Sequence, residues 1–147
     1  LSNFDNVTAY AETAGTMTAM TQEVAKSFFL YNLEKENGTF TEAQEGNLET
    51  GSNMYNGTLS FTVKKLSAAQ VQEIKLIALS RLWVIILDNN GSYWSFGAQF
   101  GADMLSSEAG TGKAFGDMNG FTLNLTSKEK DPMIDIPQAV IDTLTVA

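Results

Sequence analysis

Hydrophobic and polar residues alternate most regularly between Asn53 and Lys65. Three apolar side chains fall on one side of an extended chain there, and they are Leu59, Phe61 and Val63. Hydroxyl-bearing residues fill most of the positions between them. Side chains of a strand point alternately to the two faces of its sheet. The period of two therefore predicts a half-buried strand over these residues.

The preceding residues predict the rest of a long hairpin. Phe28 to Glu34 is rich in aromatic and aliphatic residues and predicts a strand. Asn37-Gly38 is a turn signal, because both residues tolerate positive φ, and Thr39 begins the returning strand. Glu42 to Gly51 is polar and acidic, which predicts either a long exposed loop or the tip of an extended hairpin. Residues 28–65 are therefore interpreted as an extended hairpin and a strand.

One helix is predicted over residues 67–80. The hydroxyl of Ser67 can cap its free amides, and Gln70, three residues later, completes a capping-box pattern. Apolar residues then recur at helical spacing. Arg81 to Asp88 is a continuous apolar run, which predicts a strand that is buried on both faces. A turn signal follows, and Ser92 to Gly97 is expected to return as the second strand of a hairpin.

The two ends of the chain give weaker signals. Residues 1–27 have little periodicity and predict a loop or an irregular extended segment. Phe121 to Thr126 alternates cleanly, while Ile134 to Ile136 and Val140 to Val146 predict short terminal strands. Residues 1–147 are thus expected to form a single domain, mainly β with one helix (α+β). The architecture predicted is a β-sandwich or barrel with a long hairpin arm.

Composition argues against enzymatic function. The chain contains neither cysteine nor histidine. This excludes disulfides, thiolate metal sites, cysteine nucleophiles and Ser-His-Asp triads, and it removes the commonest general base. A mechanism based on carboxylates or lysine alone stays open. We expect no catalytic residue, no metal and no cofactor. The longest strongly apolar run, Leu82 to Leu87, is far shorter than the roughly 20 residues that span a bilayer, so no membrane segment is expected.

Negative charge is concentrated near the N-terminus. The formal net charge is −8, and eight acidic residues against two lysines place −6 of it in residues 1–50. Acidic surfaces repel phosphate backbones, so tight nucleic-acid binding is not expected. The most distinctive group is five glutamates, namely Glu34, Glu36, Glu42, Glu45 and Glu49. They belong either to a solvated loop that aids solubility or to a hairpin arm that pairs edge to edge with a neighbouring subunit.

Three local motifs favour ordinary structure over chemistry. Gly110 to Lys113 resembles the end of a phosphate-binding loop, but the earlier glycine and the magnesium-binding hydroxyl of that motif are replaced. Asp88 to Ser92 offers oxygen ligands without the spacing of an EF-hand. Tyr93 and Trp94 could stack on a sugar ring, although core packing is the favoured interpretation for aromatic residues in a strand.

The order of elements resembles that of tail tube proteins of long-tailed phages and related injection machines. In both, an acidic long hairpin is followed by an alternating strand, a capped helix, a buried strand and a terminal β-run. Residues 87–97 and 109–123, followed by Glu129 to Pro132, also resemble phage structural proteins associated with Bacteroidetes hosts. The resemblance covers residues 50–137, while the N-terminal third matches by architecture alone.

The resemblance implies a virion structural protein that is made in the host cytoplasm. Its copies would form hexameric rings that stack into a hollow tail tube and conduct DNA, which passes without tight binding. Its partners would be copies of itself and other virion proteins. The hairpins would close an inner β-barrel with an acidic lumen, and the five glutamates become candidates for the lumen wall or for contacts between subunits, with only some pointing inward. Two alternatives stay open: another virion role (capsid auxiliary, head–tail joining or baseplate protein) and a carbohydrate-binding or adhesin module.

Overall fold

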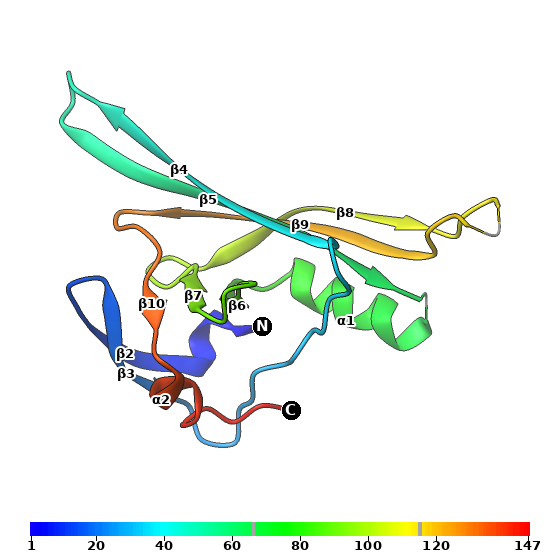
Figure 1. Cartoon of the computed structure of the whole chain (residues 1–147), viewed down its shortest axis with the longest axis horizontal. Helices are drawn as coiled ribbons and strands as arrows, with labels where there is room; N and C mark the ends of the chain where they lie inside the picture. The colour runs from blue at the N-terminus through cyan, green and yellow to red at the C-terminus, as the bar shows by residue number, and fades with distance from the viewer. Residues whose placement is uncertain (66, 115) are drawn as a thin grey trace.

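The computed structural model describes residues 1–65, 67–114 and 116–147 (Figure 1). Half of the chain is strand and two helices are described, which confirms a mainly β fold of the α+β class. In chain order the elements are β1 (Ser2–Asn3), a 3-10 turn (Phe4–Asn6), β2 (Val7–Thr13), β3 (Thr16–Gln22), β4 (Gly38–Asn47), β5 (Ser52–Lys64), α1 (Ala68–Ala78), β6 (Leu82–Leu87), β7 (Tyr93–Phe96), β8 (Ala102–Gly110), β9 (Gly120–Glu129), β10 (Asp135–Ile136) and α2 (Gln138–Ile141).

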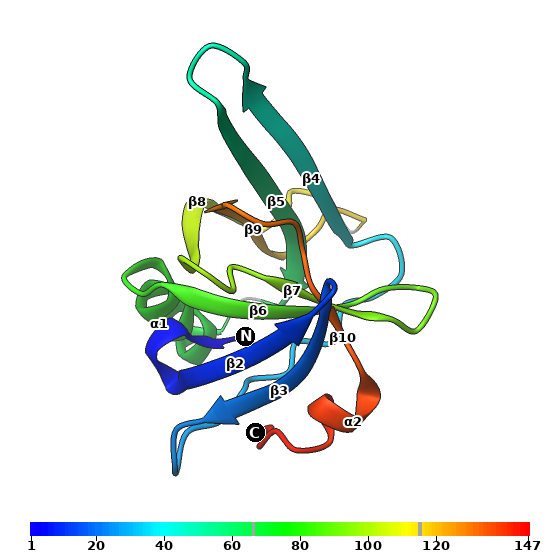
Figure 2. The ribbon, with the colours of Figure 1, turned by 90° about the vertical axis from the view of Figure 1, so that its left-hand side faces the viewer.

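The strands form one continuous and strongly bent sheet. Its order is β2-β3-β10-β7-β6-β8-β9-β5-β4, and β1 pairs separately with β6. The bend divides the sheet into two layers, with β8, β9, β5 and β4 in one and the remaining strands in the other (Figures 1 and 2). The layers are joined where Leu82 of β6 pairs with Ala102 of β8. Because this link is a single residue pair, packing between the layers must hold them together.

The first hydrophobic core lies between the two layers. Leu59 and Phe61 of β5 are buried there, which confirms the strand that the alternating sequence predicted. Leu123 and Leu125 of β9 are 1% and 0% exposed beside them. The second layer contributes residues from β6 and β7, which are Leu82, Val84 and Phe96. Each Å² of nonpolar surface that is removed from water stabilises the fold by about 25 cal/mol. This core is therefore a main source of stability.

Strand β6 separates the first core from a second one. Leu82 and Val84 face the first core, while Trp83 between them is 2% exposed and faces the second. The prediction of burial on both faces is confirmed for Leu82 to Val84, whereas Leu87 at the end of the strand is 57% exposed. The rings of Phe4 and Tyr10 pack on that of Trp83, with centroids 6.2 and 5.2 Å away. Contact with the N-terminal strands thus closes the second core.

The predicted helix is confirmed at its capped end. The Ser67 hydroxyl accepts a hydrogen bond from the Gln70 amide at 3.2 Å, and α1 runs from Ala68 to Ala78. Ile74 and Ile77 pack against the first core, although no residue of α1 is fully buried. The helix therefore covers one end of the core with a single face and leaves its other faces to solvent.

The N-terminal 27 residues form a hairpin where the sequence predicted a loop or irregular segment. Strands β2 and β3 meet at a turn in which Ala14 (φ 53°) and Gly15 (φ 79°) are left-handed. Their pairing contains two register shifts, and of their side chains only Met17 and Met20 are buried. The prediction was wrong because bulges and solvent exposure remove the alternation that marks a strand.

Residues 28–34 do not form the predicted strand. Within them only Phe28 makes a β-bridge, in parallel with Val146, and it is buried in the second core. A turn containing Glu36 (φ 64°) precedes β4, and β4 begins at Gly38, so Asn37-Gly38 does not link two strands. Apolar residues in a connecting segment can pack on a core without joining a sheet, which explains the wrong prediction.

Two further expectations are resolved by the structure. Of the alternatives for Glu42 to Gly51, the hairpin tip is correct: β4 continues to Asn47, and a turn leads into β5. The strand expected over Val140 to Val146 is wrong, since Val140 and Ile141 belong to the helix α2 and no strand follows them in this range. Short apolar segments do not distinguish helix from strand by periodicity alone.

Replacing Leu123 with alanine tests the importance of the first core. Leu123→Ala removes a side chain that is 1% exposed, and we expect the free energy of unfolding to fall by about 2–5 kcal/mol. Urea unfolding followed by circular dichroism measures this. Leu105, which is 67% exposed, supplies the control, since Leu105→Ala should change stability by no more than about 0.5 kcal/mol. Equal losses in the two variants would contradict the position of the core.

Candidate functional site

The most distinctive part of the molecule is the layer formed by β8, β9, β5 and β4, which we call the arm sheet. Strands β4 and β5 pair without any register shift from Gly38↔Phe61 to Asn47↔Ser52. Strand β9 ends opposite Tyr55, at Glu129. Residues 45–54 of the hairpin therefore extend beyond the end of β9. Both views show the hairpin reaching away from the rest of the molecule (Figures 1 and 2).

The outer edge of β4 offers a row of backbone hydrogen-bonding groups. The Thr62 amide donates to the Asn37 carbonyl at 3.0 Å, which fixes this pair as a hydrogen-bonded one. Such pairs alternate along an antiparallel ladder, so odd-numbered residues of β4 bond to β5. The amides and carbonyls of residues 38, 40, 42, 44 and 46 point outward, and β4 ends the sheet among the described residues. An unpaired edge of this kind is a template for another strand.

The opposite side of the arm sheet is also an open edge. Strand β8 pairs with β9 along its length, but it pairs with β6 only at Ala102. Within the described residues, the outward groups of β8 beyond Met104 therefore have no strand partner. A third edge, at β2, is interrupted by two register shifts, which blunt an edge against pairing. Strand β8 contains one register shift, between Met104 and Ser106. The arm sheet thus has a regular edge at β4 and a second, less regular edge at β8.

The face of the arm sheet turned away from the core is covered with short polar side chains. The register places twelve hydroxyl or amide residues there: Thr39, Thr41, Asn47, Ser52, Asn56, Thr58, Ser60, Thr62, Ser106, Thr122, Asn124 and Thr126. Some are linked across strands, as Asn124 Nδ2 donates to Ser106 Oγ at 2.9 Å. Charged groups on this face are three carboxylates and two lysines, namely Glu45, Asp103, Glu108, Lys64 and Lys128. The face is therefore polar and slightly acidic.

The structure does not bring the five candidate glutamates to one surface. Glu45 lies on the polar face, and Glu49 lies in the exposed turn at the tip. Glu34 pairs with Lys64, and Glu36 occupies the left-handed turn before β4. Glu42 points to the core side of the sheet. Nearness in sequence did not produce a common face, because alternation and the turn separate these side chains.

Glu42 instead ties the arm to the second layer. Its carboxylate accepts hydrogen bonds from the Met133 amide at 3.0 and 3.3 Å. Beside it, the rings of Phe40 and Phe96 meet edge to face with centroids 5.3 Å apart. Glycine at position 57 permits this packing, because a Cβ there would lie 2.5 Å from the Phe96 ring. The base of the arm is therefore anchored while its tip extends freely.

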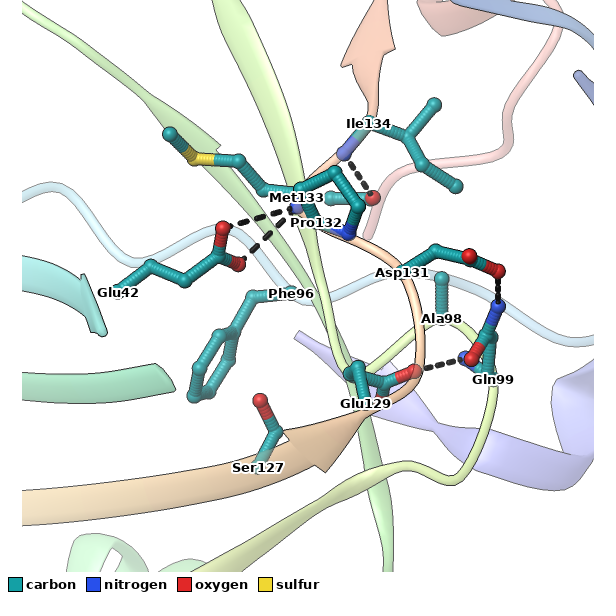
Figure 3. A pocket seen from close by; sticks show the side chains of 12 residues that line it. Glu42, Phe96, Ala98, Gln99, Ser127, Glu129, Asp131, Pro132, Met133 and Ile134 are labelled. Carbon is teal, nitrogen blue, oxygen red and sulfur yellow. Dashed lines mark hydrogen bonds between the residues drawn. The ribbon is translucent and has the colours of Figure 1, made fainter. Parts of the chain in front are cut away.

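A second carboxylate, on Glu129, holds the loop between β7 and β8 (Figure 3). It is 7% exposed and accepts hydrogen bonds from the amides of Gln99 at 2.9 Å and Phe100 at 3.3 Å. Burial raises the pKa of Glu129, the two amides oppose that rise, and the nearby carboxylates of Glu42 and Asp131 add to it. Sequence analysis did not single out Glu129 as a structural residue, because nothing in the local pattern marks a buried glutamate.

The other sequence motifs are occupied by local hydrogen bonds. Trp94 Nε1 donates to Asp88 Oδ2 at 3.0 Å, and this bond is the main cause of the lowered pKa of Asp88. Tyr93 and Trp94 are half-buried, and Tyr93 packs against the second core. Asp117 accepts two amide bonds at 2.7 Å in the glycine-rich loop after β8. These carboxylates therefore stabilise turns.

Comparisons of the chain with protein-family models, with curated proteins and with solved structures found no match. Across residues 1–65, 67–114 and 116–147, no cluster of acidic side chains is arranged to hold a metal ion. The helices in the same ranges are too short or too polar to cross a bilayer. The arm sheet, with its two open edges and polar face, is thus the candidate functional site.

The raised pKa of Glu129 predicts a specific pH dependence. A carboxyl whose pKa lies above its ordinary value of 4.5 binds a proton more tightly in the folded chain. Its contribution to stability is therefore present below pH 4.5 and is lost as pH rises through the folded pKa. Urea unfolding of unassembled protein between pH 4 and 8 should show wild type losing stability relative to Glu129→Gln as pH rises.

A difference in unfolding free energy between wild type and Glu129→Gln that stays flat over this range, or that grows with pH in favour of wild type, would contradict the prediction. Burial would then not dominate the ionisation of Glu129.

Proposed function

We propose that this chain is a virion structural protein, a tail tube subunit that assembles with copies of itself through the edges of the arm sheet. The observation that carries the proposal is the pair of open edges, at β4 and β8, on opposite sides of one four-stranded layer. Head-to-tail contact between unlike edges repeats around a ring and closes when the rotation permits. Main-chain hydrogen bonds supply the attraction without an exposed hydrophobic patch.

In such a ring the arm sheets form a continuous inner barrel. Closure removes every free edge, which is how β-barrels avoid uncontrolled pairing. Each copy contributes four strands, and the second layer with its own core lies outside. We propose a hexameric ring, as in the tail tubes that the sequence resembles, with rings stacked in the virion. Other virion proteins would contact the two ends of the tube.

The polar face of the arm sheet suits the lumen of a DNA conduit. Hydroxyl and amide groups keep the wall hydrated, and the slight excess of carboxylates over lysines repels phosphate groups. Strong attraction would hold DNA in place, whereas this surface allows passage. Among the five candidate glutamates, we assign a lumen position only to Glu45.

Electron microscopy of purified protein tests the proposal directly. Negatively stained samples should contain rings or tubes of uniform diameter, and light scattering should report a mass that rises with protein concentration. A protein that stays a compact monomer at high concentration would contradict self-assembly through these edges.

A proline in the outer edge of β4 tests which groups join the copies. The amide of Gln44 points outward, so Gln44→Pro removes an edge donor without breaking the ladder to β5. We expect the concentration needed for assembly to rise at least about tenfold, which corresponds to roughly 1.4 kcal/mol per contact, while the monomer stays folded. Sedimentation of assemblies over a concentration series measures this.

Gln44→Ala is the matched control, because both variants lose the hydrogen bond from Gln44 Nε2 to Asn53 Oδ1. The alanine variant keeps the backbone amide and should assemble like wild type. Assembly of the proline variant at the wild-type concentration would show that the β4 edge is not the joining surface.

A further inference from the structure

A cavity of about 170 Å³ lies between α1, the core side of the arm sheet and the segment that leads into β4. Figure 1 shows this segment passing beside α1. Eight residues line the cavity: Leu30, Tyr31, Asn32, Val63, Gln70, Glu73, Ile74 and Leu123. Three elements that are separate in sequence thus enclose one space, which we call the α1 cavity.

Most of the wall of the α1 cavity is aliphatic. Leu123 is buried, and Val63 and Ile74 are half-buried against the first core. Leu30, which is 66% exposed, and the exposed Asn32 mark the mouth. An apolar cavity of about 150 Å³ accommodates a molecule of the size of benzene. The α1 cavity therefore has room for about five or six non-hydrogen atoms.

Glu73 is the charged residue of this lining. It is half-buried, and its Oε1 accepts a hydrogen bond from the Tyr31 hydroxyl. Its other carboxylate oxygen has no hydrogen-bond partner among the described residues, and the ion pair found among them joins Lys64 to Glu34 instead. A carboxylate that is partly removed from water is unfavourable without a cation. The lining therefore has a negative charge that its own residues do not balance.

The neighbouring polar groups leave this charge as an acceptor. Burial and the hydrogen bond to Glu73 raise the pKa of Tyr31, so its hydroxyl stays protonated at neutral pH and donates to the carboxylate. Gln70 carries a second acceptor, because its Oε1 is buried without a hydrogen-bond partner among the described residues. Acceptors without donors favour a ligand that donates hydrogen bonds.

We propose that the α1 cavity binds the primary ammonium group of an aliphatic amine, with the ammonium at Glu73 and the carbon chain against the aliphatic wall. An ammonium has three N–H donors and a charge opposite to that of the carboxylate. Its charge-assisted hydrogen bonds are roughly twice as strong as neutral ones. Free alkylamines and the side chain of a lysine on another protein share this chemistry. The site goes beyond the proposed assembly and does not depend on it.

Ligands of other charge fit this lining less well. An anion would meet the Glu73 carboxylate, and the lining contains no lysine or arginine to offset the repulsion. A neutral apolar molecule would displace water from the carboxylate without giving it a donor. The single charge of the lining therefore selects among molecules that are small enough to enter.

Ligand-observed NMR tests this selection, and it applies to assembled and unassembled chains because it detects the small molecule. The probe is n-butylamine, which is protonated at pH 7 like the lysine side chain, whose pKa is about 10.4. Saturation-transfer difference spectra over a concentration series should give a saturable curve. The dissociation constant should be at least about tenfold lower than for 1-butanol or butyrate. Equal affinity for 1-butanol, or no saturable binding of n-butylamine, would overturn the proposal.

A charge-removing variant locates the site. Glu73→Gln keeps an oxygen that accepts from Tyr31, so the fold should be retained, which circular dichroism checks. The affinity for n-butylamine should fall at least about tenfold, whereas that for 1-butanol should not change. Glu23→Gln is the matched control, because it removes the same charge from an exposed residue outside the cavity and should bind like wild type. Equal affinity of both variants for n-butylamine would overturn the site.

A lysine derivative distinguishes the two sources of the ammonium. Nα-acetyl-lysine methylamide carries the ammonium and its four-carbon chain on a peptide backbone. Affinity equal to that of n-butylamine would identify a protein lysine as a ligand of the cavity, and weaker affinity would identify a free amine. Either result supports the site when Glu73→Gln weakens binding, and binding of both molecules that is unaffected by Glu73→Gln overturns it.

Discussion

The packing of the Phe96 ring against the core side of the arm sheet connects the two layers of the molecule. The ring fits over Gly57, where any side chain would collide with it, and meets Phe40 edge to face. Among the described residues, only Leu82 and Ala102 join the layers through strand pairing. The Phe96 contact and the surrounding core therefore set the direction of the arm. A hairpin anchored at its base can project from the body and still hold one direction.

Anchoring at the base explains why the edges of the arm sheet can stay open. Glu42 and Glu129 satisfy backbone amides of neighbouring loops with carboxylates, so those loops need no strand partner from the arm. Pairing groups on β4 and β8 are thereby left available, while the bulges of β2 make the third edge unsuitable. Exposure of a long regular edge is a liability for a monomer, and the self-assembly that we propose would cover it.

Local patterns predicted the middle of the chain well. The alternation around Phe61, the Ser67 cap and the apolar run around Trp83 each contain a signal within a few residues, and the structure confirms all three. The N-terminal hairpin and the connection after Phe28 were missed because their conformation depends on distant partners such as Val146. The polar face was hidden for the same reason, since only the register of four strands gathers its residues.

The arm also has a direction, and this limits the assemblies it can form. Its tip carries Glu45 and Glu49 and no basic residue, so two arms placed tip to tip would bring carboxylates together, which disfavours a symmetric dimer through the tips. The two long edges of the arm sheet also differ, because β4 pairs with β5 without a register shift whereas β8 contains one. Contact between these unlike edges would be heterologous, and its repetition would close into a ring when the rotation permits.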